Sequence, residues 1–307
     1  MVSNHINKSM IQSAINKGIK DIEDNPKRGL RNLVDLANHF ANSPFQKYLF
    51  NLMQAELSKV DSPYYNIISS MVNNVDHKTL KKFGMNLGYN SWTRGSEIIR
   101  SNNKEDYKNH IPWTIVFDFT IENDTKLNKE NIMDIVRHGK KIGIYTYIFF
   151  ANNIEIYSDI LIANPDCAFI IFLPLRKLNL DSITQIALYH NVFLCIPYET
   201  NTSIWDFQNT INFLEKNKSL FGIYSYYSDN NVDEILNDNW VKGIIDKKIS
   251  FVFLVESKKC SPDNSKSIEE YVIDSRINQN SPVFLIDLYK DILYIDKIIS
   301  GFYKRKK

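Results

Sequence analysis

From Trp113 onward, short apolar runs alternate with helical patterns, and this alternation constrains the fold more than any other feature. The runs are apolar on both faces, as strands covered by helices on both sides must be. Such a repeat predicts parallel pairing with right-handed crossovers. Six units are too few for a closed eight-fold barrel, so the sequence predicts an open partial barrel or a doubly wound sheet. The six runs are residues 113–119, 144–150, 168–174, 192–198, 221–227 and 251–256.

Residues 1–108 contain helical patterns only, and they predict an all-helical extension packed beside the barrel. Leu30, Val34 and Ala37 recur at helical spacing. Pro26 is expected in the first turn of a helix, and Asp76 is expected to cap another. Residues 109–260 then form the partial barrel. Residues 261–307 form a C-terminal segment that closes it, with one further strand-like run at 282–289.

Composition and charge exclude several classes of function. The net charge of +2 gives no electrostatic argument for nucleic acid or for a membrane surface. No apolar run reaches the roughly 18 residues of a membrane-spanning helix, and the N-terminus lacks the apolar core of a signal peptide. Three widely spaced cysteines fit a reducing compartment, so we expect a cytoplasmic protein. The histidines show neither HxxxH nor HxH spacing, and no metal site is predicted.

Polar residues follow several of the predicted strands. Carboxyl ends of strands meet at the mouth of a (βα) barrel, where such proteins place their functional residues. One interpretation is a polar pocket at the mouth that binds a small ligand. The alternative is that these residues cap helices and shape loops, which Asp and Asn do well. The candidates are Asp118, Asn152, Asn153, Glu199 and Glu256.

The order of several segments resembles a known family. These segments are DNPKRGLRNLVDLANHFA (24–41), FGMNLGYNSWTRGSEIIR (83–100), IPWTIVFDFT (111–120) and FLIDLYKDILYIDKIISG (284–301). Together they resemble radical SAM proteins with an N-terminal helical extension, over nearly the whole chain. The resemblance implies a partial (βα)6 TIM-like barrel. It also implies a four-iron, four-sulfur cluster on a CxxxCxxC loop after the first strand, with S-adenosylmethionine on the fourth iron.

The chain departs from this family where the chemistry resides. Residues 121–128, IENDTKLN, follow the first strand and contain no cysteine. Phe150-Ala151-Asn152-Asn153 stands where the family has a Gly-Gly-Glu-Pro motif that contacts S-adenosylmethionine. Cys167 and Cys195 are predicted to be small apolar core residues, and Cys260 lies in a distant loop. We therefore predict that the cluster and S-adenosylmethionine have been lost, and that no residue is catalytic.

Three hypotheses remain. In the first, the chain is a pseudoenzyme that acts by binding a protein, either an active homologue or its peptide substrate. In the second, it is a cluster-independent enzyme or a small-ligand binder that uses Asp118, Asn152 and Glu199. In the third, it is a decaying gene product without a selected role.

Overall fold

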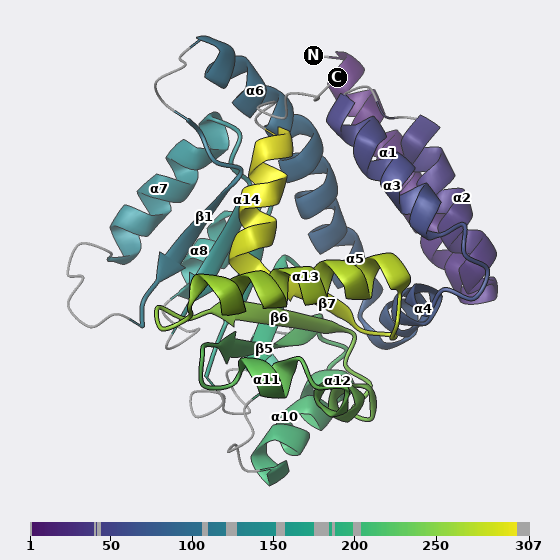
Figure 1. The fold of residues 1–307 in the computed structure, drawn as a ribbon. Coiled ribbons are helices and arrows are strands. Elements are labelled where there is room, and N and C mark those ends of the chain that lie inside the picture. Colours follow the sequence, from purple (N-terminus) through teal and green to yellow (C-terminus); the bar gives the residue numbers. More distant parts are fainter. Residues whose placement is uncertain are drawn as a thin grey trace, which may run out of the picture.

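A single curled sheet of seven parallel strands forms the centre of the molecule (Figure 1). The computed structural model describes residues 2–39, 41, 44–105, 110–120, 128–151, 157–174, 184–185, 188–198 and 204–299. Each strand pairs with the next along the chain. The strands are β1 (Thr114–Asp118), β2 (Thr146–Phe150), β3 (Ala168–Phe172), β4 (Val192–Pro197), β5 (Phe221–Tyr227), β6 (Phe251–Glu256) and β7 (Phe284–Asp287).

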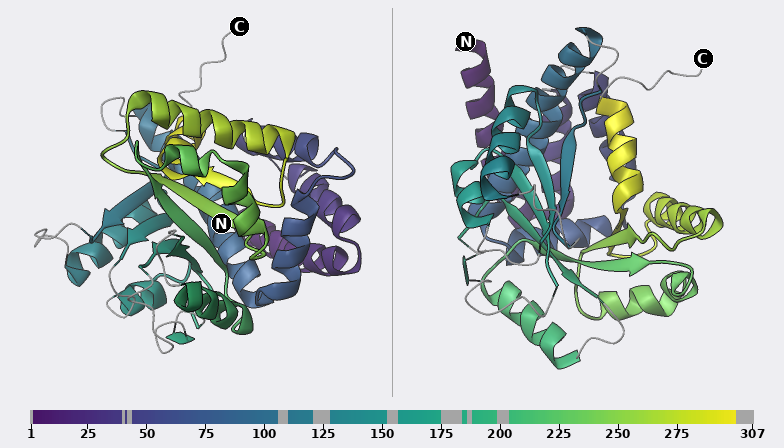
Figure 2. Two further views of the ribbon diagram at one scale, coloured as in Figure 1. Left: turned by 60° about the horizontal axis from the view of Figure 1, so that its bottom comes forward. Right: turned by 90° about the vertical axis from the view of Figure 1, so that its left-hand side faces the viewer.

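The predicted α/β partial barrel with a helical extension is confirmed, and it has one strand more than the six-unit pattern. The strand-like run near residue 284 is this seventh strand, and it continues the parallel order with Phe251 opposite Phe284. Figure 2 shows how far the sheet curls without closing. The strands β1 and β7 therefore form its two edges.

Crossover helices cover the convex face of the sheet. Their inward apolar side chains pack against alternate strand residues in the largest hydrophobic cluster, which includes Val136, Leu214 and Ile268. Burial of these side chains is the main stabilising contribution to this layer. The helices are α7 (Lys129–Lys141), α8 (Ser158–Ala163), α10 (Ile204–Lys216), α11 (Val232–Ile235), α12 (Asp238–Ile245) and α13 (Pro262–Asn278). None of the helices in the described ranges is both long and apolar enough to cross a bilayer.

In its described part the chain before β1 contains helices and turns but no strand, and it has a hydrophobic cluster of its own that includes Ile22, Leu30 and Tyr65. One helix begins at Pro26, and Asp76 caps another by accepting a hydrogen bond from the Thr79 backbone N–H at 3.0 Å. The elements are α1 (Val2–Asp24), α2 (Pro26–His39), α3 (Pro44–Glu56), α4 (Tyr64–Asn74), α5 (His77–Gly84), the π-helix η1 (Met85–Gly95) and α6 (Ser96–Glu105).

The last helix, α14 (Leu288–Ile299), leaves the β7 edge and runs to the start of β1, in front of the sheet in Figure 1. There Trp113 donates from its indole Nε1 to the Ile292 carbonyl at 3.0 Å. Its backbone N–H donates to Asp296 at 3.2 Å. Together with α5 and η1, α14 buries the concave face of the sheet, through Phe83, Leu87 and Leu288. Both faces of the parallel sheet are thus covered.

The end of η1 meets the turn between α7 and β2 through main-chain contact. A Cβ at Gly95 would lie 2.3 Å from the Gly143 carbonyl oxygen, and Gly143 itself has a φ of +101°. Gly95→Ala should therefore lower the free energy of unfolding by about 1–3 kcal/mol, as overpacking does. Urea denaturation measures this change.

Gly84→Ala is the matched control, because a Cβ there meets nothing within 4 Å. It should leave stability unchanged or raise it by up to about 1 kcal/mol. Equal destabilisation by the two substitutions would contradict the proposed close approach of η1 to the turn.

Candidate functional site

Asp118 ends β1 and shapes a turn at the mouth of the half-barrel. Its neighbour Val116 packs in the concave cluster, so the strand alternation directs Asp118 to the same side. The carboxylate accepts hydrogen bonds from the Thr120 backbone N–H at 2.9 Å and from the Thr120 hydroxyl at 2.6 Å. The pKa of Tyr289, a residue of α14, is raised mainly by burial and in addition by the charge of Asp118. Asp118 is thus a turn-forming residue that also faces α14.

Glu256 lies in a different environment from Asp118. It is the last residue of β6. Leu254, two positions earlier, packs in the convex cluster, so the strand alternation directs Glu256 to the same side. Its Oε2 is 3.4 Å from the Tyr227 hydroxyl and 3.8 Å from Lys290 Nζ. Asp118 and Glu256 end strands that are separated by four others, and the strand alternation directs their side chains to opposite faces of the sheet. The other predicted site residues, Asn152, Asn153 and Glu199, lie outside the described residues.

Aromatic side chains fill the concave face near the carboxyl ends of the central strands. Phe150 stacks on Phe172 with ring centroids 4.6 Å apart. Edge-to-face contacts then join Phe172 to Tyr224 at 5.2 Å and to Phe253 at 5.4 Å. All four residues are buried. Such contacts add to the stabilisation from area burial, and they make this part of the interior apolar.

The three cysteines lie in separate places. Cys167 precedes β3 and packs in the convex cluster, whereas Cys195 lies within β4 in the concave cluster. Both are fully buried, as predicted, and burial raises the pKa of each thiol. Cys260 follows β6 and is partly buried. Across the described part of the chain, no three His, Cys, Asp or Glu side chains are grouped so that they could hold a metal ion.

A buried carboxyl group at the end of β7 is the most perturbed acid of the site. Asp287 is 1% exposed, and its Oδ2 accepts a hydrogen bond from the Tyr227 hydroxyl at 3.2 Å. Its Oδ1 has no hydrogen-bond partner among the described residues. The pKa of Asp287 is raised to about 6. Burial is the largest cause; the hydrogen bond from the Tyr227 hydroxyl opposes the rise, and the charge of Asp291 adds to it. The sequence reasoning missed this residue, although an acid inside the apolar run FLIDLY was the available signal.

A cavity of about 640 Å³ opens beside Asp287, between the helical extension and the C-terminal helices. We call it the α13 groove. Its walls are mainly apolar, and Asp287, Tyr64 and Arg276 are among its polar residues. Arg276 donates from Nε to the Leu285 carbonyl at 2.7 Å and pairs with Asp291 through both Nη atoms. Pockets of this size and composition are typical ligand sites.

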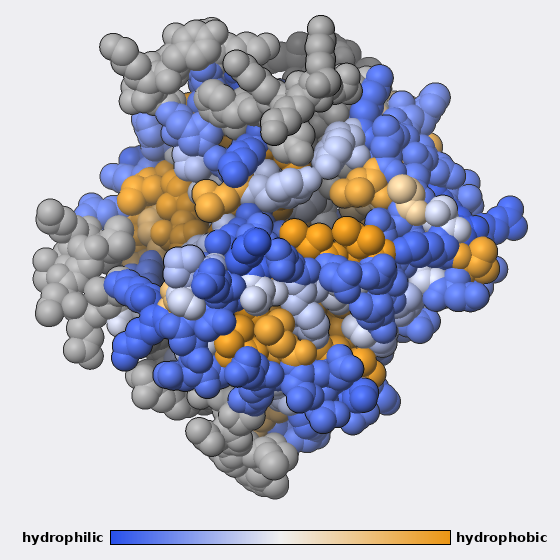
Figure 3. Space-filling view, in the orientation of Figure 1, coloured by the Kyte–Doolittle hydropathy of each residue, from blue (hydrophilic) through white to orange (hydrophobic). Residues whose placement is uncertain are grey.

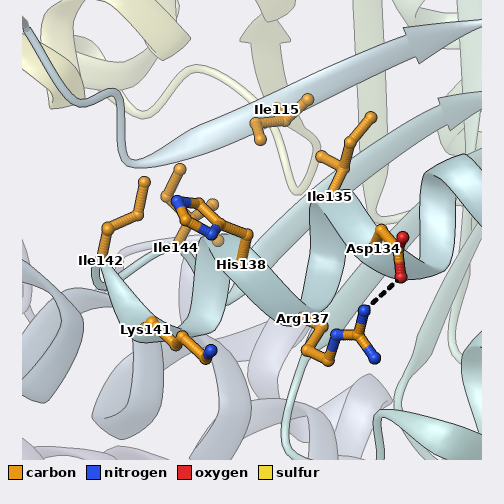
Figure 4. A pocket seen from close by; sticks show the side chains of 9 residues that line it. Ile115, Asp134, Ile135, Arg137, His138, Lys141, Ile142 and Ile144 are labelled. Carbon is orange, nitrogen blue, oxygen red and sulfur yellow. Dashed lines mark hydrogen bonds and ion pairs between the residues drawn. The ribbon is translucent and has the colours of Figure 1, made fainter.

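A second cavity of about 520 Å³ lies between α7 and the edge strand β1 (Figure 4). Arg137 pairs with Asp134, and the Lys141 side chain points away from the isoleucines of the wall. His138 is exposed. The polar groups of this cavity are thus paired with each other or directed to solvent, and they do not converge on a common point.

No family model and no curated protein matches the sequence. Among solved structures, the chain is similar to Streptococcus suis SuiB. For SuiB bound to the precursor peptide SuiA, the TM-score is 0.47 and the identity 13%, over 61% of this chain and 51% of that one. For SuiB bound to S-adenosylmethionine the TM-score is also 0.47, with 13% identity over 61% and 49% of the two chains. For a third SuiB structure the TM-score is 0.45 and the identity 13%, over 81% of this chain and 60% of that one. The chain thus spans about half to three fifths of the length of SuiB.

The raised pKa of Asp287 makes stability depend on pH. Because the folded pKa of about 6 exceeds the ordinary aspartate pKa of 3.8, ionisation is disfavoured in the folded state. The stability contribution of the neutral acid is complete below about pH 4 and is lost as the pH rises through 6. Asparagine does not ionise, so the Asp287→Asn variant does not lose this stability as the pH rises. The mutant should therefore gain stability over the wild type between pH 4 and pH 7.5, on the order of 2–3 kcal/mol.

Urea denaturation of both proteins at a series of pH values measures this gain. Asp61→Asn is the control, because the Asp61 side chain is 96% exposed. It should show no comparable trend. A constant difference between Asp287→Asn and the wild type across the pH range would contradict the assignment.

Proposed function

We propose that this chain is a radical SAM-like half-barrel without an iron–sulfur cluster, which acts by binding another protein or a peptide and not by catalysis. The observation that carries the proposal is the aromatic filling of the concave face by Phe150, Phe172, Tyr224 and Phe253. A polar cofactor held inside the half-barrel needs space and hydrogen-bonding groups near the strand ends. The four buried side chains occupy that space, and only the Tyr224 hydroxyl among them can form a conventional hydrogen bond.

The cysteine positions support the same proposal. Three irons of such a cluster require three thiolates that converge on one point. Cys167 and Cys195 are buried in clusters on opposite faces of the sheet, and their raised pKa values disfavour the thiolate form. The residues present therefore do not fit the cluster, and we derive no chemical step that uses it.

A protein partner is supported by apolar side chains exposed on the helical extension. Tyr48, Leu52 and Met53 of α3 are all exposed. Scattered exposed apolar residues are normal, but three on one helix form a contiguous surface of the kind that marks protein interaction sites.

Metal and cofactor analysis tests the non-catalytic part of the proposal. After anaerobic reconstitution with iron and sulfide, the protein should hold far less than the roughly four irons per chain that a full cluster requires. Calorimetry should detect no binding of S-adenosylmethionine. Four irons per chain together with an equivalent amount of sulfide would refute the proposal.

Affinity capture from the extract of the protein's own cells tests the binding part. A partner retained by the wild type should be lost with Leu52→Glu, because the charge removes an apolar contact on α3. Ile162→Glu is the matched control, since Ile162 is an exposed isoleucine on α8. It should retain the partner. Equal retention of the partner by both variants would show that α3 is not part of the binding surface.

A further inference from the structure

The helix α13 has two apolar faces, and only one of them packs on the sheet. Ile268 and Val272 are buried against the convex side. Ile273 and Ile277, one turn apart, are 46% and 57% exposed. Residues four positions apart lie on the same side of a helix, so these isoleucines form a second apolar stripe. This stripe lines the α13 groove.

The opposite wall of the groove is also apolar and exposed. Leu52 and Met53 of α3 are 45% and 38% exposed, and Tyr294 of α14 is 43% exposed. Figure 3 shows hydrophobic side chains gathered along α13 and beside α3, with hydrophilic residues around them. Since these residues come from three helices and surround one cavity, they form a continuous apolar channel with open rims.

Two polar atoms among the lining residues lack partners. The Tyr64 hydroxyl and Asp287 Oδ1 are buried, and neither has a hydrogen-bond partner among the described residues. Burial raises the pKa of Tyr64 to about 12, so this hydroxyl stays protonated. Buried polar groups are almost always hydrogen-bonded, and each exception calls for an explanation. Because both atoms are inaccessible from the groove, they do not identify the chemistry of an occupant.

The charges of the groove favour a cationic occupant. Four carboxylates and two cations line it. Arg276 is already paired with Asp291, and Lys290 lies 3.8 Å from Glu256, which is outside the lining. Among the lining residues, Glu56 and Glu269 therefore have no cation partner, whereas just outside the lining Lys59 donates to the Ile277 carbonyl. A complementary partner carries basic residues beside an apolar surface.

We infer that the α13 groove binds an amphipathic helix of a partner protein, with apolar side chains between α3 and α13 and lysine or arginine beside Glu56 and Glu269. This inference rests on the proposed binding function and assigns a surface and a ligand chemistry to it. Grooves between helices recognise amphipathic helices through apolar anchors at helical spacing. The stretch of α13 from Glu269 to Ile277 is about 12 Å long, which matches about two turns of a docked helix.

The probe is a fluorescein-labelled helical peptide of leucine and lysine of about 14 residues, patterned so that leucine forms one face. Fluorescence anisotropy should show that the full-length protein binds it at least about tenfold more tightly than a leucine–glutamate peptide of the same pattern. Ile277→Lys should weaken binding of the leucine–lysine peptide at least about tenfold, because it places a charge on the apolar stripe. Ile277 is exposed, so thermal melting should confirm that the variant remains folded.

Ile162→Lys is the matched control, with the same change at an exposed isoleucine on α8, and it should bind like the wild type. Equal affinity of Ile277→Lys and the wild type would overturn the inference, as would equal binding of the glutamate peptide. Tenfold tighter binding after removal of residues 301–307, which include the basic run Lys304–Lys307, would make the chain's own end the occupant and would also overturn it.

This test is independent of the test for a cluster. Iron loading or binding of S-adenosylmethionine would refute the proposed function without changing the effect of Ile277→Lys. Conversely, failure of the groove to bind the peptide would overturn this inference but would not change the result of the iron analysis.

Discussion

The contact between Trp113 and α14 is the interaction on which the rest of the half-barrel depends. An open parallel sheet has two free edges, and its faces are stable only when both are covered. The helix α14 begins directly after the β7 edge and is held at the start of β1 by hydrogen bonds from Trp113 to Ile292 and Asp296. One helix therefore connects the two edges and covers the concave face between them.

This closure has a consequence for the interior. With α14, α5 and η1 packed on the concave side, the strand residues that face it are largely apolar, and rings such as Phe172 contact several neighbours. An interior of this kind stabilises the fold by burial, but it leaves little room for a polar ligand. Asp118, at the end of β1, serves the local turn at Thr120.

The sequence was sufficient for the strands, the extension and several helix ends, because these depend on local patterns. Pro26 and Asp76 mark helix starts by their own chemistry. Positions that depend on register could not be predicted in this way. Glu256 ends a strand as expected, yet the face on which it lies follows from the packing of Leu254. Asp287 was missed because its environment depends on residues distant in sequence, such as Tyr227 of β5, 60 positions away. In addition, an acid in an apolar run is also compatible with an exposed strand end.

The α13 groove is lined mainly by parts of the chain that lie outside the strand–helix repeat. Its walls come from the helical extension, from α13 and α14, and from Phe251, Phe284 and Asp287 of the strands β6 and β7. Changes of sequence after β1 and β2 can therefore remove cofactor chemistry while the lining residues of the groove stay the same, provided that α14 still closes the half-barrel. A scaffold arranged in this way can lose catalysis and retain binding, because different residues carry the two properties.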